Sequence, residues 1–263
     1  MARGHATRRP NLTPDVQIEG RHPVMEALRA GRPLRKLVVA RGTAARSLQP
    51  LIGEAHRRGI PVQEVEKAVV DRLARTRAPQ GVIAYAAARR VVDIDDLLSL
   101  AQARGEAPFV LLLDGVEDPG NLGAILRSAD AAGVHGVVIP QRRAVGLTPA
   151  VAATSAGAIE HVLVAQVPNL SHAFERLKAQ GVWVIGADAG AEQAMYDVSL
   201  RPPVAIVAGG EGRGLSRLVR ERCDLLVRIP MHGETASLNV SVATALVLFE
   251  VRRQLRGAEA PAP

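Results

Sequence analysis

The sequence predicts an α/β protein in two parts, a large C-terminal unit around a mostly parallel sheet and a smaller N-terminal α/β unit. In the C-terminal part, short apolar runs alternate with segments of helical periodicity, which is the pattern of parallel strands connected by helices. A polar stretch that ends in G-E-A-P separates this part from the residues before it. The 263 residues are enough for one large domain or two modest ones.

The N-terminal unit is expected over residues 16–88, behind a polar, basic tail at 1–15. Apolar periodicity together with Gly and Pro breaks predicts three helices and three strands in it. The helices are expected at 22–30, 48–58 and 67–74, and the strands at 36–40, 61–65 and 82–87. Residues 89–106 are expected to be a linker that carries a short helix at 94–103.

The C-terminal unit is expected over 107–256, followed by a short tail at 257–263. It opens with F-V-L-L-L-D-G, a continuous apolar run typical of a strand buried on both faces. Strands are predicted at 109–115, 136–140, 161–167, 183–188, 204–210 and 225–230. Helices are predicted at 122–132, 148–158, 170–180 and 215–222, with a last, nearly all-apolar helix from 234 to 250.

The basic charge lies in the N-terminal third of the chain. Residues 1–90 hold 16 Arg and 2 Lys against 7 acidic residues, whereas residues 91–263 have a net charge of −4. This asymmetry indicates either a module that faces nucleic acid or an arginine-rich, solvated surface. Aromatic residues make up only 2% of the chain, which argues against a platform that stacks bases.

Several classes of protein are excluded by what the sequence lacks. No apolar run reaches the roughly 18 residues of a membrane span, and the first residues lack the apolar core of a secretory signal. Cys223 is the only cysteine, so intrachain disulfides and cysteine metal cages are excluded, and a buried structural thiol is expected. We therefore expect a cytoplasmic protein without a metal.

Polar residues follow the first strand of the C-terminal unit in the run D-G-V-E-D-P-G-N-L-G-A-I-L-R-S-A-D. Asn121 stands at a helix start, where it is either an ordinary N-cap or a ligand contact. Arg127 lies six residues further on, and the apolar residues around it argue against a purely solvated helix face.

A second glycine-rich loop, G-G-E-G-R-G, follows the strand at 204–210 and places Glu211 at the sheet edge. Neither loop contains a G-x-G-x-x-G or a Walker A pattern, so both nucleotide fingerprints are absent. The loop is either a close approach to a ligand or a flexible lead into a helix. Ligands of parallel sheets bind at the carboxyl ends of the strands, which favours the first interpretation.

The last helix begins with two polar residues where one cap would suffice. Ser237 and Asn239 stand two residues apart in E-T-A-S-L-N-V-S-V-A. Ser237 is the better N-cap candidate, which leaves Asn239 inside the helix at a position of poor propensity. The spacing alone leaves the reason for a second polar residue open.

Three segments resemble the signature motifs of the SpoU/TrmH family, which belongs to the SPOUT class of RNA ribose 2′-O-methyltransferases. They are D-G-V-x-D-P-x-N-x-G-A-I-x-R-S-A, V-A-I-V-x-G-x-E-G-x-G-L-S and I-P-M-x-G-x-x-x-S-L-N-V-S-V-A. The resemblance covers about 150 residues, and the third motif is the most specific. Residues 18–86 also resemble the L30e-like substrate-binding domain of the RlmB-type branch, with Ala78 departing from an expected His-Gln-Gly turn.

The resemblance implies a C-terminal SPOUT domain with a deep trefoil knot and S-adenosyl-L-methionine as cofactor. It assigns cofactor binding to Gly209, Ile229 and Leu238, with Gly212 and Met231 as neighbours. It further implies a homodimer and methylation of a guanosine ribose in the peptidyl-transferase region of 23S rRNA. The alternatives are a tRNA ribose methyltransferase and a non-catalytic RNA-binding assembly protein; a nicotinamide-dependent dehydrogenase lacks its glycine fingerprint here.

By the same resemblance the catalytic residues are Asn121, Arg127, Glu211 and Asn239, with Ser237 in support. A guanidinium does not act as a base near neutral pH, so Arg127 is expected to contact the substrate and lower the 2′-hydroxyl pKa electrostatically. The two asparagines would orient the ribose, and Glu211 would fix either Arg127 or its own loop.

Overall fold

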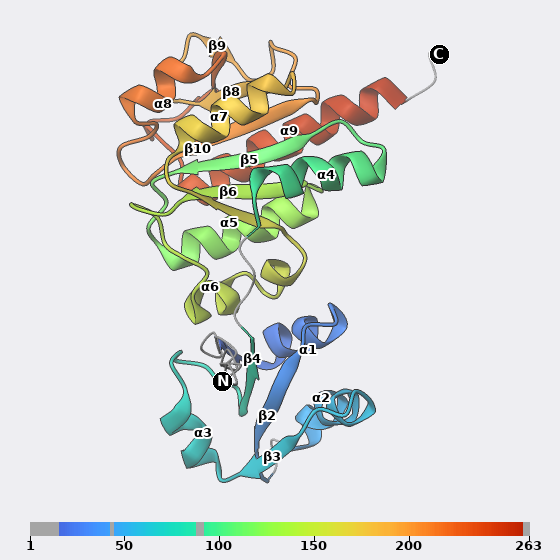
Figure 1. The fold of residues 1–263 in the computed structure, drawn as a ribbon. Helices are drawn as coiled ribbons and strands as arrows, with labels where there is room; N and C mark the ends of the chain where they lie inside the picture. Colours follow the sequence, from blue (N-terminus) through green and yellow to red (C-terminus); the bar gives the residue numbers. More distant parts are fainter. Residues whose placement is uncertain (1–15, 43–44, 88–91, 260–263) are drawn as a thin grey trace, which may run out of the picture.

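The computed structural model describes residues 16–42, 45–87 and 92–259, which form two α/β units (Figure 1). The predicted tail at 1–15 lies outside the described residues. The smaller unit has a four-stranded sheet in the order β1-β4-β2-β3, in which β4 is antiparallel to β1 and β2, and β2 is parallel to β3. Its elements are β1 (Val16–Glu19), α1 (Arg21–Arg29), β2 (Leu34–Ala40), α2 (Ala45–Arg57), β3 (Val62–Val65), α3 (Lys67–Leu73) and β4 (Val82–Ala86).

Strand β1 has no counterpart among the predicted elements. It is only four residues long, and the polar Gln17 and Glu19 interrupt its apolar pattern, yet both polar side chains are buried. A short strand whose buried positions are polar gives no recognisable period.

The larger unit has a seven-stranded parallel sheet in the order β7-β6-β5-β10-β8-β11-β9. Its strands are β5 (Phe109–Asp114), β6 (Gly136–Pro140), β7 (Val164–Val167), β8 (Trp183–Ala187), β9 (Gln193–Ala194), β10 (Val204–Gly209) and β11 (Leu225–Arg228). Its helices are α4 (Ile94–Arg104), α5 (Pro119–Ala131), α6 (Pro149–Thr154), the 3-10 helix η1 (Ala158–Glu160), α7 (Leu170–Ala179), α8 (Arg217–Arg222) and α9 (Val240–Glu259). The α/β class and the mostly parallel sheet are therefore confirmed.

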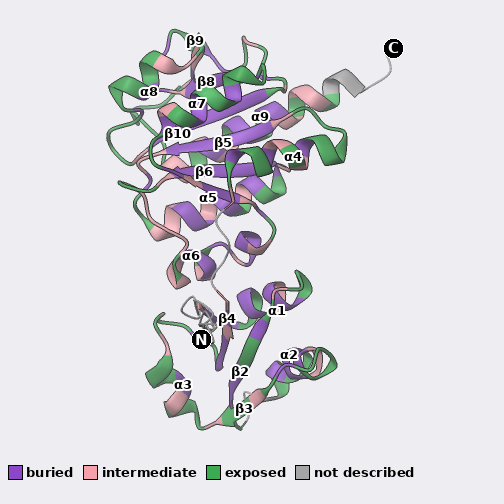
Figure 2. Ribbon diagram, viewed as in Figure 1, coloured by how far each residue is buried: buried purple, intermediate pink, exposed green. Residues whose placement is uncertain are grey.

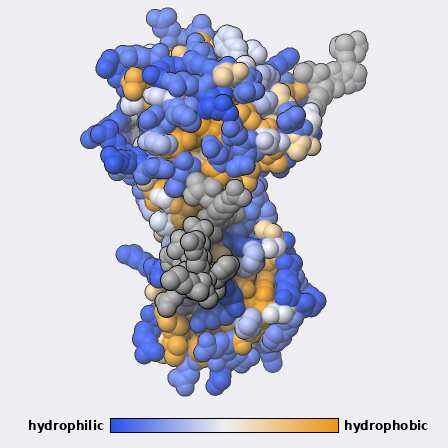
Figure 3. Space-filling model, in the orientation of Figure 1, coloured by the Kyte–Doolittle hydropathy of each residue, from blue (hydrophilic) through white to orange (hydrophobic). Residues whose placement is uncertain are grey.

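Helices cover both faces of this sheet, and the alternation of side chains along β5 shows how. Leu111 and Leu113 belong to the apolar cluster formed with α5 and α9, whereas Val110 and Leu112 belong to the cluster formed with α4 and α7. Figure 2 shows the strands buried along their length and the exposed residues on the outer surfaces of the helices. In Figure 3 hydrophilic side chains cover most of the visible surface of both units.

Four further differences separate the predicted elements from the observed ones. The helix expected at 148–158 is divided into α6 and η1, because Ala156 and Gly157 adopt positive φ angles of 50° and 93°. The last helix begins at Val240 instead of 234 and runs to Glu259, so only residues 260–263 of the predicted tail lie outside the description. The two-residue strand β9 was not expected.

The helix expected at 94–103 is present as α4, but it packs into the core of the larger unit instead of lying in a linker, which is the fourth difference. Ile94 and Leu97 of this helix are fully buried in the cluster with Val110 and Leu112. Asp93 and Asp96 form a capping box at its start, and Gly105 ends it in the left-handed conformation.

The two units touch through α1, η1 and α6. Arg32 donates to Glu160 at 2.6 Å, and both side chains are nearly buried. His161 and Glu26 lie within hydrogen-bond distance, at 3.2 Å, and Gly157 packs against the Glu26 side chain. No helix of the described residues is long and apolar enough to cross a bilayer.

Candidate active site

The strand order reverses between β5 and β10, which makes their carboxyl ends the expected ligand position of this sheet. Asp114 and Gly209 end the two strands as register partners. The loop after β5 leads into α5, and the loop after β10 leads towards α8. The first two sequence motifs therefore lie side by side at one edge.

Backbone contact between these loops requires glycine at 210. A Cβ atom there would lie 2.2 Å from the Gly115 carbonyl oxygen, a distance that no side chain tolerates. Asp114 strengthens the junction, since its Oδ2 accepts the Ser216 N–H at 2.7 Å. Asp114 was not among the predicted site residues, although it is the first polar residue after the apolar run of β5.

Three of the predicted catalytic side chains form one hydrogen-bonded chain across this edge. Asn121 Nδ2 donates to Glu211 Oε1 at 2.7 Å, and Asn239 Nδ2 donates to Asn121 Oδ1 at 3.0 Å. Asn121 is 90 positions from Glu211 and 118 positions from Asn239 in sequence, and each of the three residues comes from a different motif. The fold thus brings together residues that the sequence could only group by resemblance.

The carboxyl group of Glu211 fixes the direction of the whole chain. It offers acceptors only, so Asn121 must present its NH₂ to Glu211 and its oxygen to Asn239. Burial raises the pKa of Glu211, but hydrogen bonds from the Asn121 side chain and from backbone N–H groups, including that of Glu117, outweigh it and leave the pKa below its ordinary value. Glu211 is therefore ionised at neutral pH and holds both amides in one orientation.

Asn239 has the role at the start of α9 that was predicted for Ser237. It immediately precedes Val240, and its Oδ1 accepts the N–H of Ser241 at 2.9 Å and the Ser241 hydroxyl at 2.6 Å. The expectation that Asn239 lies inside the helix, with Ser237 as its cap, was wrong, because the chain before Val240 is irregular. Asn239 combines helix capping through its oxygen with donation to Asn121 through its nitrogen.

Arg127 stands apart from this chain. Its side chain is exposed on α5, while Ile125, Leu126 and Ala129 point into the core on the other side of the helix. The apolar neighbours therefore do not surround Arg127, contrary to the sequence argument. Among the described residues Glu211 bonds to Asn121 and to the Glu117 backbone, so it ties its own loop to the loop after β5 and does not hold Arg127.

The remaining predicted residues line one hollow beside the chain, between the loops after β8, β10 and β11. Its volume is about 370 Å³, and Glu211 belongs both to its wall and to the hydrogen-bonded chain. Met231 and Leu238 line it although 39% and 36% of their surfaces are exposed. Its lining includes Gly209, Gly212, Ile229, Met231, Ser237 and Leu238.

Sequence reasoning missed a charged pair in the wall of this hollow. Asp188 is buried at the end of β8, accepts the Gly190 N–H at 2.8 Å and pairs with Arg220 at 2.5 Å. The only available signal was the position of Asp188 directly after an apolar strand.

Other chemistry is not supported by the described residues. They contain no group of three His, Cys, Asp or Glu side chains arranged to hold a metal ion. Burial raises the pKa of the Cys223 thiol to about 12, so this thiol is not a nucleophile at neutral pH.

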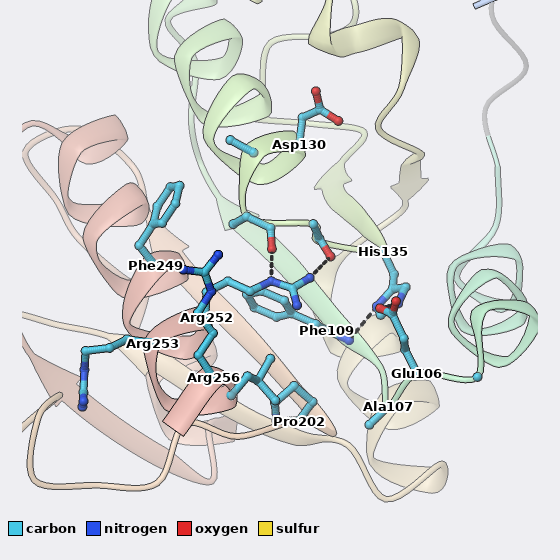
Figure 4. Close-up of a pocket in the computed structure, with 15 residues that line it drawn as sticks. Glu106, Ala107, Phe109, Asp130, His135, Pro202, Phe249, Arg252, Arg253 and Arg256 are labelled. Carbon is cyan, nitrogen blue, oxygen red and sulfur yellow. Dashed lines mark hydrogen bonds and ion pairs between the residues drawn. The ribbon is translucent and has the colours of Figure 1, made fainter. Parts of the chain in front are cut away.

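A larger hollow, of about 870 Å³, lies where β5 begins, α5 ends and the second half of α9 passes (Figure 4). Arg252 occupies its wall, donating to the carbonyl groups of Ala132 and Gly133 and lying 5.7 Å from the Phe109 ring centre. None of the predicted site residues lines it, and it faces the amino ends of the strands. Cavity volume alone would therefore have favoured the amino ends of the strands, whereas the predicted residues lie at the carboxyl ends.

The glycine-rich carboxyl edge of the sheet therefore carries an amide–carboxylate chain beside a hollow with both apolar and charged walls, which is the arrangement of a ligand-binding α/β protein. Residues 108–249 match the model of the SpoU rRNA Methylase family, and residues 17–92 match that of the RNA 2′-O ribose methyltransferase substrate-binding domain. The chain belongs to the SpoU family of RNA methyltransferases.

Relatives with known sequence or structure agree with this assignment. YacO of Bacillus subtilis (strain 168), assigned to the TrmH family of tRNA/rRNA methyltransferases, is 46% identical over 90% of this chain and 95% of its own. The SpoU methyltransferase AviRb of Streptomyces viridochromogenes, solved with AdoMet, is 26% identical with a TM-score of 0.76 over 92% of this chain and 91% of its own. The AdoMet-bound rRNA methyltransferase of Sinorhizobium meliloti is 27% identical, with a TM-score of 0.74 over 92% and 88%.

Proposed function

We propose that this RNA methyltransferase transfers a methyl group from S-adenosyl-L-methionine to the ribose 2′-hydroxyl of a guanosine in 23S rRNA. The observation that carries the proposal is the Glu211–Asn121–Asn239 chain, which ends beside the hollow that Glu211 also lines. It places oriented hydrogen-bonding groups next to a cavity of about 370 Å³, whose apolar and polar lining suits a small organic cofactor.

The hollow fits the cofactor chemically. Ile229, Met231 and Leu238 offer apolar surface to an adenine ring, and the backbone at Gly209 and Gly212 offers polar groups without side chains in the way. When bound, the cofactor supplies an electrophilic methyl group. Two structural relatives carry AdoMet, which supports the same cofactor here.

The residues of the chain would position the acceptor ribose. Methyl transfer to a neutral hydroxyl requires alignment of the hydroxyl with the methyl group and stabilisation of the developing alkoxide. Asn121 and Asn239 provide amide groups held in one orientation by Glu211. Arg127 is exposed and has no ion pair or hydrogen bond of its side chain among the described residues, so it is free to contact a phosphate or the ribose oxygen.

Ribosomal RNA is the preferred substrate, with tRNA as the alternative. The match of residues 17–92 to a substrate-binding domain and the basic N-terminal third support a large structured RNA. The name of the relative YacO includes both substrates, so the exact acceptor is decided by experiment.

A homodimer is proposed from α9. Val242, Leu246 and Phe249 recur at spacings of four and three residues and are 48%, 41% and 49% exposed. Such an apolar stripe on one helix face is typical of a helix that packs against a partner. We also infer the trefoil knot, because the parallel sheet and the matched family model are those of SPOUT methyltransferases.

Cofactor and substrate titrations test the proposal. Calorimetry with S-adenosylhomocysteine and with NAD is expected to show binding of the first alone. Transfer of labelled methyl to unmodified 23S rRNA, measured beside bulk tRNA, is expected to exceed transfer to tRNA. Equal or greater labelling of tRNA would replace rRNA by the alternative substrate, and NAD binding without S-adenosylhomocysteine binding would overturn the enzyme class.

A further inference from the structure

A buried polar network in the N-terminal unit holds one exposed loop in a fixed shape. Glu19 is only 2% exposed, and both of its carboxyl oxygens accept hydrogen bonds from the segment after α3. Its Oε1 accepts the Arg75 N–H at 2.6 Å, and its Oε2 accepts the Thr76 N–H at 3.0 Å and the Thr76 hydroxyl at 2.5 Å. A buried carboxyl group with this many donors is rarely kept for packing alone.

Gln17 extends the network and is also nearly buried. Its amide nitrogen donates to Glu19 Oε1 and to the Leu73 carbonyl, both at 2.8 Å. Both inward polar side chains of the short strand β1 therefore hold residues 73–76 in place through hydrogen bonds. None of these contacts serves the hydrogen-bonded chain of the candidate active site.

The loop that this network fixes presents cations to solvent. The Arg75 and Arg77 side chains are exposed, and neither has an ion pair or a hydrogen bond among the described residues. By contrast, the exposed side chains of Arg57 and Arg58 both pair with Glu54. Unpaired arginines on a rigid backbone bind phosphate at a lower entropic cost than flexible ones.

The start of α1 adjoins the same loop and adds a third cation. The Arg21 N–H donates to Gln80 Oε1 at 3.0 Å, and Gly20 lies close to the Ala78 carbonyl. Arg21 is exposed as well, so the surface combines a helix amino terminus with three arginines. In Figure 1 the connection from α3 to β4 lies on the left side of the view, as do the carboxyl ends of β5 and β10.

We propose that Arg21, Arg75 and Arg77 form a contact surface for the phosphate backbone of the substrate RNA, and that Glu19 is the positioning residue that fixes it. This inference rests on the proposed function for the identity of the RNA. The surface is built for phosphates and not for bases, because it offers guanidinium groups and no aromatic side chain. It anchors the RNA while the ribose is presented to the other unit.

The test compares the full-length Arg21→Ala/Arg75→Ala/Arg77→Ala variant with the paired control Arg57→Ala/Arg58→Ala. For 23S rRNA we expect the triple variant to raise KM roughly tenfold or more, with kcat and S-adenosylhomocysteine affinity unchanged. The slope of log affinity against log salt is expected to become shallower by about two to three, because each phosphate contact contributes about 0.7 to 0.9. The control variant should differ little from the wild type.

Glu19→Gln tests the positioning role, because an amide cannot accept all of these backbone donors. We expect a raised KM with an unchanged kcat and all three arginines present; an unchanged KM in a folded protein would refute the role of Glu19. If the triple variant has the KM and the salt slope of the wild type, the proposed phosphate contacts are wrong, while the proposed function is unaffected. A triple variant that binds naked rRNA normally but loses binding to protein-containing ribosomal particles would show an acidic protein partner instead, and would also overturn it. If the wild type methylates no RNA, the proposed function is wrong. Filter binding of rRNA to the wild type and the triple variant then tests by itself whether the three arginines bind RNA.

Discussion

Asn239 carries two separable roles, and a single substitution can divide them. Asn239→Asp keeps an oxygen that accepts the Ser241 N–H, so α9 stays capped, but it removes the NH₂ that donates to Asn121. We expect Asn239→Asp to keep the melting temperature and lose methyl transfer. Asn239→Ala should lose both, with a stability cost of about 1 kcal/mol for the cap. An active Asn239→Asp enzyme would contradict the role of the donated hydrogen bond.

Arg127 is predicted to matter for activity and not for stability. Its side chain is exposed and makes no ion pair or hydrogen bond among the described residues, so Arg127→Ala should shift the free energy of unfolding by no more than about 0.5 kcal/mol. Methyl transfer should nevertheless be lost, as measured with labelled cofactor and rRNA. Turnover like that of the wild type would remove Arg127 from the catalytic residues.

His135 is predicted to make stability depend on pH. Burial foremost, and Arg104 in addition, lower the pKa of His135 despite Glu106, and its Nδ1 accepts the Phe109 N–H at 3.0 Å. The unfolded ring takes up a proton below about pH 6.5. The stability due to the neutral ring is therefore complete above that pH and falls as the pH drops further. Urea unfolding should show this decline between pH 7 and 5.5, and His135→Gln should flatten it; equal slopes would contradict the assignment.

At the scale of elements, the loop after β10 depends on the missing side chain of Gly210. Gly210→Ala would bring a Cβ atom against the Gly115 carbonyl and push the two loops apart. We expect a loss of more than about 1 kcal/mol of stability and a marked loss of S-adenosylhomocysteine affinity. Gly146→Ala is the matched control, because nothing lies within 4 Å of its Cβ position. Calorimetry that finds equal affinities for the two variants would disprove the role of the close approach.

Regular elements with strong periodicity were predictable from the sequence, whereas those determined by other parts of the chain were not. The apolar run of β5 and the caps of α4 are local signals, and the structure has both elements. β1 was missed because Gln17 and Glu19 are buried through partners 56 and 57 residues away in sequence. The late start of α9 was missed because Asn121, 118 residues earlier, receives the Asn239 amide.

In the candidate site, too, local sequence signals identified some residues, whereas contacts between distant parts of the chain could not be predicted. Position after a strand identified Asn121 and Glu211, and the resemblance added Asn239, but no sequence pattern could show that the three side chains form one chain. Of the two partners expected for Glu211, Arg127 or its own loop, Arg127 makes no contact with it, because helix geometry points Arg127 away from the buried side of α5. Asp114 and Asp188 were missed because single charged residues near strand ends carry no specific signal, and Arg220 because it lies among other charged residues of α8.

For the whole molecule, the exposed stripe on α9 predicts a dimer. Leu246→Arg should place a charge in the middle of Val242 and Phe249 and yield a monomer by light scattering, since a buried unpaired charge is costly. Leu218→Arg, at a 51% exposed position of α8, is the matched control and should leave the assembly unchanged. A wild-type chain that is monomeric at micromolar concentration would contradict this prediction.

Mapping the methyl group that the enzyme adds is the most direct test of the proposed ribose methylation. Wild-type protein is incubated with methyl-labelled S-adenosyl-L-methionine and unmodified 23S rRNA, and the labelled nucleotide is identified, with Asn239→Asp in parallel. We expect label on the ribose 2′-oxygen of a guanosine with the wild type and none with the variant. Label on a base, or equal labelling by Asn239→Asp, would contradict it.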